Sequence, residues 1–206
     1  MELSKQIKSL VVLIGLCSLF VLGCDQFYCP CESSPLVNQY NDSTLNEVLN
    51  SELGAPTAWK NFDELKLSES EGEAYRFLYL APFGKYKKIY RLEALGSAKV
   101  LTIKTFSATY DSLGERTESE EKSTRNLSLK EWSSFQNVLS ENCFWHMPVF
   151  DERRGLDGSN WLLEGFEPTP NRCQRRDYHF VYRWAPNTSS QAFLEICDEF
   201  KKLEFP

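Results

Sequence analysis

The sequence predicts an α+β domain in which helices pack on one face of an antiparallel sheet of about six strands. Residues 74–127 and 158–184 contain runs in which apolar and polar side chains alternate, which is typical of half-buried strands. Residues 129–140 and 188–203 instead place apolar side chains three and four positions apart, as an amphipathic helix does. Strands in runs, with the helices set apart from them, favour an antiparallel sheet.

The predicted domain begins with a short helix at residue 44. Thr44 and Glu47 match a capping box, apolar residues at helical spacing follow, and Gly54 ends the helix. No internal repeat and no later linker divides residues 44–206, so we expect a single domain there.

Four strands joined as a meander are predicted between residues 74 and 127. Tyr75, Phe77 and Tyr79 alternate in the first strand, and β-branched residues fill the third. The turns between the strands are predicted at Pro82–Gly84, Gly96–Ser97 and Leu113–Gly114. The fourth segment, Arg116–Leu127, is polar and charged, which suits a sheet edge because charges discourage pairing with other chains.

Ser128 and Glu131 form a second capping box and predict a helix over residues 129–140. Strands are expected at residues 158–166 and 177–184, on either side of a loop that contains Pro and Asn. The last helix has a capping pair, Thr188 and Gln191, and an apolar stripe, Phe193, Ile196, Cys197, Phe200 and Leu203.

The first residues of the chain are arranged like a secretory signal. Lys5 and Lys8 supply positive charge, Leu10–Leu22 is a run of thirteen mostly apolar residues, and Gly23 precedes Cys24. A helix that crosses a bilayer needs about 20 apolar residues, so this run is too short to be a permanent span.

Val21-Leu22-Gly23-Cys24 resembles the lipobox of bacterial lipoproteins. The resemblance implies cleavage after residue 23, acyl chains on Cys24, and a stable membrane anchor, since two or more chains hold a protein firmly. Residues 24–43 are then the lipidated cysteine and a tether. Asp25 resembles the signal that keeps lipoproteins of enteric bacteria in the inner membrane, facing the periplasm. The alternative is an ordinary cleaved signal in which Cys24 is a plain cysteine.

Charge limits the classes of partner. Without residues 1–23, the chain keeps 23 − 2 = 21 basic and 29 − 1 = 28 acidic residues, a net charge of −7. This balance argues against binding to nucleic acid and against electrostatic adhesion to anionic lipid. It suits a basic protein partner, and it is also an ordinary charge for solubility.

The chemically interesting side chains concentrate between residues 155 and 186. The candidate ligand-binding residues are Asp157, Trp161, Glu164, His179, Arg183 and Trp184. Gly-Leu-Asp-Gly-x-x-Trp-x-x-Glu followed by Tyr-His-x-x-x-Arg-Trp-x-Pro looks like a segment of small uncharacterised bacterial envelope proteins, a resemblance that implies no activity.

Three interpretations of this cluster remain open. If the two strands pair, Glu164 is expected to face His179 or Arg183, and such a cross-strand ion pair needs no active site. A ligand pocket would use Arg183 to grip an anion and Trp161 or Trp184 as a stacking wall. A hydrolase would use Asp157, Glu164 and His179 as titrating groups. The sequence lacks Gly-x-Ser-x-Gly and His-Glu-x-x-His and has two histidines, which weakens the third interpretation.

Five cysteines remain besides Cys24 and the one in the signal: Cys29, Cys31, Cys143, Cys173 and Cys197. Cys143 with Cys173 is the preferred disulfide because both flank predicted elements, and an extracytoplasmic location permits it. Cys197 lies on an apolar helix stripe and is expected to be a buried thiol. A zinc set of Cys143, His146, Cys173 and His179 is a further alternative whose spacing matches no standard module.

These observations favour a lipid-anchored envelope protein, without cofactor or metal, whose domain binds another envelope protein in an accessory or immunity-type role. The alternatives are a small-ligand-binding lipoprotein that uses the 155–186 cluster and a hydrolase.

Overall fold

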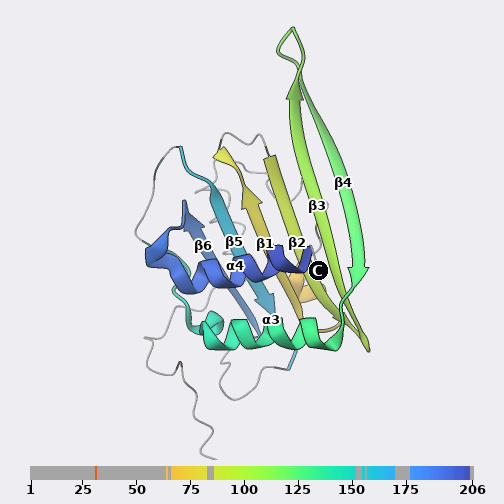
Figure 1. Ribbon diagram of the computed structural model, residues 1–206, viewed down its shortest axis with the longest axis vertical. Helices are drawn as coiled ribbons and strands as arrows, with labels where there is room; N and C mark the ends of the chain where they lie inside the picture. Colours follow the sequence, from red (N-terminus) through yellow and green to blue (C-terminus); the bar gives the residue numbers. More distant parts are fainter. Residues whose placement is uncertain are drawn as a thin grey trace, which may run out of the picture. The chain divides into compact units, whose positions relative to one another are not determined.

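The computed structural model describes residues 31, 64, 66–82, 86–151, 155, 157–169 and 177–204. These residues form a six-stranded antiparallel sheet and two α-helices, which confirms the predicted α+β fold (Figure 1). In chain order the elements are η2 (Leu67–Glu69), β1 (Ala74–Leu80), β2 (Tyr86–Leu95), β3 (Ala98–Tyr110), β4 (Arg116–Asn126), α3 (Leu129–Glu141), η4 (Phe144–His146), β5 (Asn160–Phe166), β6 (Tyr178–Trp184), η5 (Thr188–Ser190) and α4 (Gln191–Glu204). The helix predicted at residues 44–53 lies outside the described residues.

The strands lie in the order β4-β3-β2-β1-β5-β6, and every neighbouring pair is antiparallel. The first four strands form the expected meander, and β5 then pairs with the free side of β1. The polar strand β4 lies at an edge of the sheet, as its charges predict. In the described part of the chain, no helix is long and apolar enough to cross a bilayer.

Both α-helices pack on the same face of the sheet, here called the helix face (Figure 1). Their apolar stripes meet alternate residues of the central strands in a core rich in aromatic rings. Phe200 of α4 lies at its centre, with ring centroids 4.8 Å from Phe135 of α3 and 5.8 Å from Phe77 of β1. The predicted spacing of apolar residues in both helices therefore identified the face that is buried.

The opposite face, here called the charged face, buries a second apolar cluster and, beside it, ionisable side chains. Arg76 and Arg91 are direct cross-strand partners in β1 and β2 and are 3 % and 8 % exposed. Arg76 donates two hydrogen bonds to Glu164, at 2.7 and 2.9 Å. Glu64 carboxylate oxygens lie 3.5 Å from Arg76, 3.3 Å from Arg91 and 2.9 Å from Lys104. Carboxylates thus separate cations that would otherwise repel one another.

The sequence predicted an N-terminal cap for each α-helix, and the prediction is right for α3 but not for α4. At α3, the Ser128 hydroxyl accepts a hydrogen bond from the Glu131 amide while the Glu131 carboxylate accepts one from the Ser128 amide, which confirms the capping box. At the last helix, the predicted Thr188 cap is wrong. Residues 188–190 form the 3-10 turn η5, and the Asn187 side chain accepts the hydrogen bond from the Ser189 amide.

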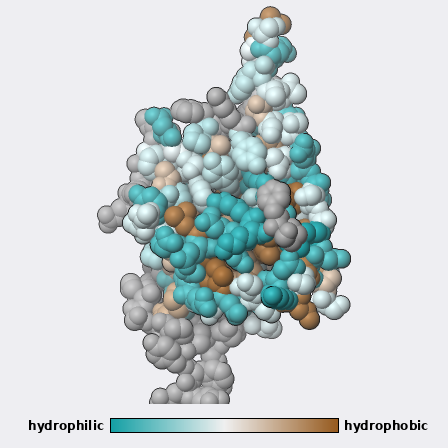
Figure 2. Space-filling model, in the orientation of Figure 1, coloured by the Kyte–Doolittle hydropathy of each residue, from teal (hydrophilic) through white to brown (hydrophobic). Residues whose placement is uncertain are grey.

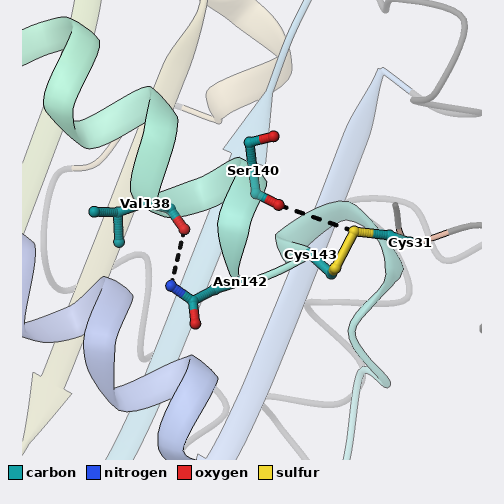
Figure 3. The surroundings of a disulfide bond; sticks show 5 residues. All are labelled: Cys31, Val138, Ser140, Asn142 and Cys143. Atoms are coloured by element: carbon teal, nitrogen blue, oxygen red, sulfur yellow. Dashed lines mark hydrogen bonds between the residues drawn. A yellow bond between two sulfur atoms is a disulfide. The ribbon is translucent and has the colours of Figure 1, made fainter. Parts of the chain in front are cut away.

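A disulfide joins Cys31 to Cys143 (Figure 3). The predicted pairing of Cys143 with Cys173 is therefore wrong, and Cys173 lies outside the described residues. Cys143 follows the last turn of α3 in a left-handed conformation, and the Cys31 sulfur lies 3.9 Å from the Ser140 carbonyl oxygen. The bond closes a loop with a sequence separation of 112 residues, and long loops restrict the unfolded chain most in the loop-entropy model.

Cys197 is a free, fully buried thiol on α4, as its place on the apolar stripe predicts. Burial raises its pKa well above the ordinary value, so it remains a protonated, unreactive thiol.

Candidate functional site

The predicted cluster is divided between the two faces of the sheet. The β5–β6 register pairs Trp161 with Arg183 and Glu164 with Phe180. Because successive side chains of a strand alternate, Trp161, His179 and Arg183 belong to the helix face, whereas Glu164 belongs to the charged face. The expectation that Glu164 faces His179 or Arg183 is therefore wrong by one position of register.

Glu164 is a structural ion-pair partner. It is 1 % exposed, and besides the two bonds from Arg76 it accepts a hydrogen bond of 2.8 Å from the Tyr178 hydroxyl. Burial lowers the pKa of Arg76, but the attraction of Glu164 outweighs it and the net shift is upward, so the guanidinium remains charged. Glu164 is thus sealed from solvent and fully engaged with its neighbours.

The proposed titrating set of Asp157, Glu164 and His179 does not converge. Asp157 is exposed in the loop before β5, and Glu164 and His179 lie on opposite faces. His179 is 1 % exposed, with its ring centroid 5.2 Å from that of Phe144 and 6.3 Å from that of Trp145. Acid–base catalysis requires the groups to share a reacting atom, and these three residues do not lie together around one.

Arg183 holds the chain along the outer edge of β6. Its guanidinium donates to the carbonyl oxygens of Pro148, Val149 and Tyr182, at 2.9, 3.1 and 2.7 Å. The Asp151 carboxylate lies 3.9 Å away, and the Tyr182 amide donates to the Val149 carbonyl at 2.8 Å. Because these donors are engaged with the backbone, Arg183 covers a sheet edge and does not grip an anion.

Trp184 explains the two glycines of the Gly-Leu-Asp-Gly motif. A Cβ atom at Gly155 would lie 2.3 Å from the indole ring, and one at Gly158 would lie 2.4 Å from it. Real Cβ atoms do not approach so closely, so both positions need glycine for the loop to pack on the ring. Trp184 therefore holds the loop that leads into β5, which is a structural role.

Trp161 lies in a cavity of about 270 Å³ on the helix face, here called the Trp161 pocket. In Figure 1, α3 and α4 cross the lower part of the sheet, whereas β1 ends and β2 and β5 begin above the two helices. The pocket is lined by Phe77, Tyr79, Tyr86, Lys88, Tyr90, Trp161 and Lys201. Of the predicted ligand-binding residues, Trp161 alone lines this pocket.

The rings and charges of the Trp161 pocket are held in place. The Trp161 ring is perpendicular to that of Tyr79, at a centroid distance of 5.3 Å, and the Lys201 ammonium lies 4.4 Å from the Trp161 centroid. Glu204 accepts hydrogen bonds from Lys88 and, at 2.9 Å, from the Tyr90 hydroxyl. Burial and this bond raise the pKa of Tyr90, so its hydroxyl keeps its proton.

The sequence contained part of the signal for this pocket. Tyr86, Lys88 and Tyr90 occupy alternate positions of a predicted strand and therefore share one of its faces, and Tyr79 lies on the strand before it. Their meeting with Lys201 depends on where α4 crosses the sheet, which strand periodicity does not encode.

A second exposed feature is the β3–β4 hairpin, which extends beyond the rest of the sheet (Figure 1). The pairing of β3 with β2 ends at Ser107, whereas its pairing with β4 continues to Tyr110. The Asp111 carboxylate orders the turn by accepting hydrogen bonds from the amides of Leu113, at 2.9 Å, and Glu115, at 2.8 Å. The tip is therefore an ordered turn at the end of the continuous hydrogen-bonded ladder of β3 and β4.

The hairpin tip exposes two apolar side chains, and its flanks are acidic. Tyr110 is 56 % exposed and Leu113 is 85 % exposed, and Figure 2 shows hydrophobic side chains at the end of the projection. Residues 111–121 contain five acidic residues and one basic residue, a net charge of 1 − 5 = −4.

No group of three metal-ligating side chains occurs among the described residues. The alternative zinc set fails at Cys143, because its sulfur is bonded to Cys31 and cannot act as a thiolate ligand. No family model, curated protein or solved structure matches the chain.

Proposed function

We propose that this protein is a lipid-anchored envelope protein whose domain binds a basic surface of another envelope protein through the tip of the β3–β4 hairpin. The observation that carries the proposal is the ordered projection that presents Tyr110 and Leu113 above acidic flanks. A binding role without catalysis accords with the separation of Glu164 and His179 onto opposite faces.

The hairpin has the properties of a contact element. Burying a Leu side chain such as that of Leu113 in a partner's pocket is worth about 1.5–3 kcal/mol. The strand ladder and the Asp111 turn order the tip before binding, so little conformational entropy is lost on contact. The charge of residues 111–121 favours encounter with a basic partner and disfavours acidic ones.

The proposed anchor restricts where such a partner lies. Cys31 is seven residues after Cys24 and is bonded to Cys143 in the domain. A chain spans at most about 3.3–3.6 Å per residue, so the attachment point lies within roughly 25 Å of the lipidated residue. The partner is then expected at or near the same membrane surface, with the periplasmic side of the inner membrane favoured by Asp25.

Site-specific photo-crosslinking in intact cells tests this proposal. A photoreactive amino acid at position 113 is expected to give one discrete adduct with a basic envelope protein. The matched control is position 129, because Leu129 is also strongly exposed, at 74 %, but lies on α3. Glu120→Lys is expected to reduce the adduct, whereas Glu141→Lys on α3 leaves it unchanged.

The Cys24→Ser variant completes the experiment. It is expected to lose incorporation of labelled fatty acid and to weaken the adduct, because the domain is no longer concentrated at the membrane. Equal adducts from positions 113 and 129 would contradict the hairpin contact. Retained fatty-acid labelling in Cys24→Ser would contradict the anchor.

A further inference from the structure

We propose that the Trp161 pocket binds a small ligand that combines an apolar ring face with a single carboxylate. This inference is independent of the hairpin and of the lipid anchor. The sequence predicted a ligand pocket in which Trp161 stacks on the ligand and Arg183 binds its anionic group. Here Trp161 keeps that role, and Lys201 and Lys88 take the place of Arg183.

The walls of the pocket favour a ring. The Trp161 centroid lies 5.4 Å from that of Phe77 and 5.3 Å from that of Tyr79, whose ring also lies 6.2 Å from that of Tyr86. Rigid rings of this kind offer broad apolar contact with little entropy to lose, and they stack on aromatic rings or on the C–H face of a sugar. A cavity of about 270 Å³ lies just below the usual range of ligand pockets, about 300–1,000 Å³, so one ring with a short substituent suits it.

The charges of the pocket favour one negative group. Lys88 and Lys201 line it, and Glu204 compensates Lys88, to which it is hydrogen-bonded. Lys201 pairs with Asp198 on the exposed side of α4, with side chains 42 % and 56 % exposed, and such pairs are weak. Lys201 is therefore the cation of the pocket that is more readily released from its carboxylate partner to bind an anion.

Lys201 is the group expected to bind the carboxylate. Its ammonium lies over the Trp161 ring at 4.4 Å, so an anion that it binds is held next to the stacking wall. Charge-assisted hydrogen bonds of this kind are roughly twice as strong as neutral ones. A second carboxylate would approach Glu204, which limits the ligand to a single charge.

Titration of the full-length protein in detergent, followed by NMR of the indole N–H signals, tests the inference. The Trp161 signal is assigned by its absence in Trp161→Phe. Phenylacetate represents an aromatic acid and glucuronate an acidic sugar, with benzyl alcohol and glucose as their neutral counterparts. We expect a saturable shift of the Trp161 signal with at least one of the acids and at least tenfold weaker binding of its neutral counterpart.

Two adjacent lysines of α4 provide the matched variants. Lys201→Ala is expected to weaken binding of the acid at least tenfold. Lys202→Ala is expected to leave it unchanged, because the Lys202 side chain is 71 % exposed and pairs with Glu199 away from the pocket. Both lysines lie on the helix surface, and unchanged circular dichroism verifies that each variant folds.

The acid that binds identifies the source of the ligand. A response to phenylacetate alone indicates an aromatic acid, and a response to glucuronate alone indicates an acidic sugar. The inference is overturned if neither acid shifts the Trp161 signal, if the neutral counterparts bind equally, or if Lys201→Ala and Lys202→Ala have the same effect. None of these results bears on crosslinking at position 113.

Discussion

The two faces of the sheet are built from alternate residues of the same strands, and each buries an apolar cluster, but the charged face also buries a network of ion pairs. On the helix face, rings from α3 and α4 pack on Tyr75, Phe77 and Leu92, and the gain follows the apolar area removed from water. On the charged face, Arg76 and Glu164 are equally well buried, but their attraction must first offset the cost of removing two charges from water. Similar burial therefore does not imply a similar contribution to stability.

The ion pairs of the charged face specify the register of the strands, which the burial of apolar area does not. Glu64 precedes β1 by ten residues in the sequence and contacts cations of β1, β2 and β3. An ion-pair network of this kind fixes which residues lie opposite one another, since a shift of one position would place Arg76 and Glu164 on opposite faces. Because both faces bury an apolar cluster, we expect both to stabilise the domain and the ion pairs of the charged face to determine its register as well.

The largest expected effect is on the helix face. Phe200→Ala removes a fully buried ring that contacts Phe135 and Phe77 and leaves a cavity, which costs about 3–5 kcal/mol of unfolding free energy. Urea unfolding followed by circular dichroism measures it. Phe200→Leu keeps most of the volume and is expected to lose less. A loss below 1 kcal/mol in Phe200→Ala would show that α4 is not central to the core.

The second-largest expected loss of stability distinguishes the charged face from the helix face. Glu164→Gln leaves buried Arg76 with the more distant carboxylate of Glu64, at 3.5 Å, as a counter-charge, and is expected to cost about 3 kcal/mol. The double variant Arg76→Met/Glu164→Leu removes both charges and is expected to recover most of that loss. Such rescue has no counterpart on the helix face, where a second truncation adds to the first. Additive losses in the double variant would mean that the pair stabilises the native state outright.

Sequence patterns predicted the fold well because local signals and tertiary contacts agree in it. Alternation placed β1–β6, and Ser128 with Glu131 placed the start of α3, where the capping bonds form as expected. The sheet edge at β4 followed from its charges. Each of these features depends on residues that are near one another in the chain.

The candidate site was predicted poorly because it depends on distant residues. Glu164 was assigned to the wrong neighbours because strand alternation fixes a face within one strand, whereas pairing register fixes it between strands. Lys201 meets Trp161 only through the crossing of α4 over the sheet. The pairing of Cys143 with Cys31 likewise follows from the folded chain, because spacing alone does not fix disulfide connectivity.

The smallest effect concerns the rim between the faces, where charges are partly solvated. Arg125 of β4 donates to the Glu131 carboxylate at 2.8 Å and also to the Leu203 carbonyl, so it links the N-terminal cap of α3 to the last turn of α4. Ser128→Ala removes the cap of α3 and is expected to cost about 1 kcal/mol, well below either buried change. Thermal unfolding resolves this difference, and Ser133→Ala, an exposed serine inside α3, is the matched control.

The same rim gives a pH dependence that distinguishes it from both faces. The hydrogen bond from Arg125, followed by those from Ser128, lowers the pKa of Glu131 from 4.5 to about 2. A carboxyl group whose pKa is lowered by folding stabilises the protein above its unfolded pKa, and this contribution disappears as the pH falls through the folded value. Glu131→Gln is therefore expected to be less stable than the wild type at pH 6, and the difference should shrink between pH 4.5 and about 2. A difference that stays constant across that range would contradict the titration of Glu131 as its cause. Equal stabilities at pH 6 would assign the role of Glu131 to its shape and not to its charge, because glutamine keeps the shape.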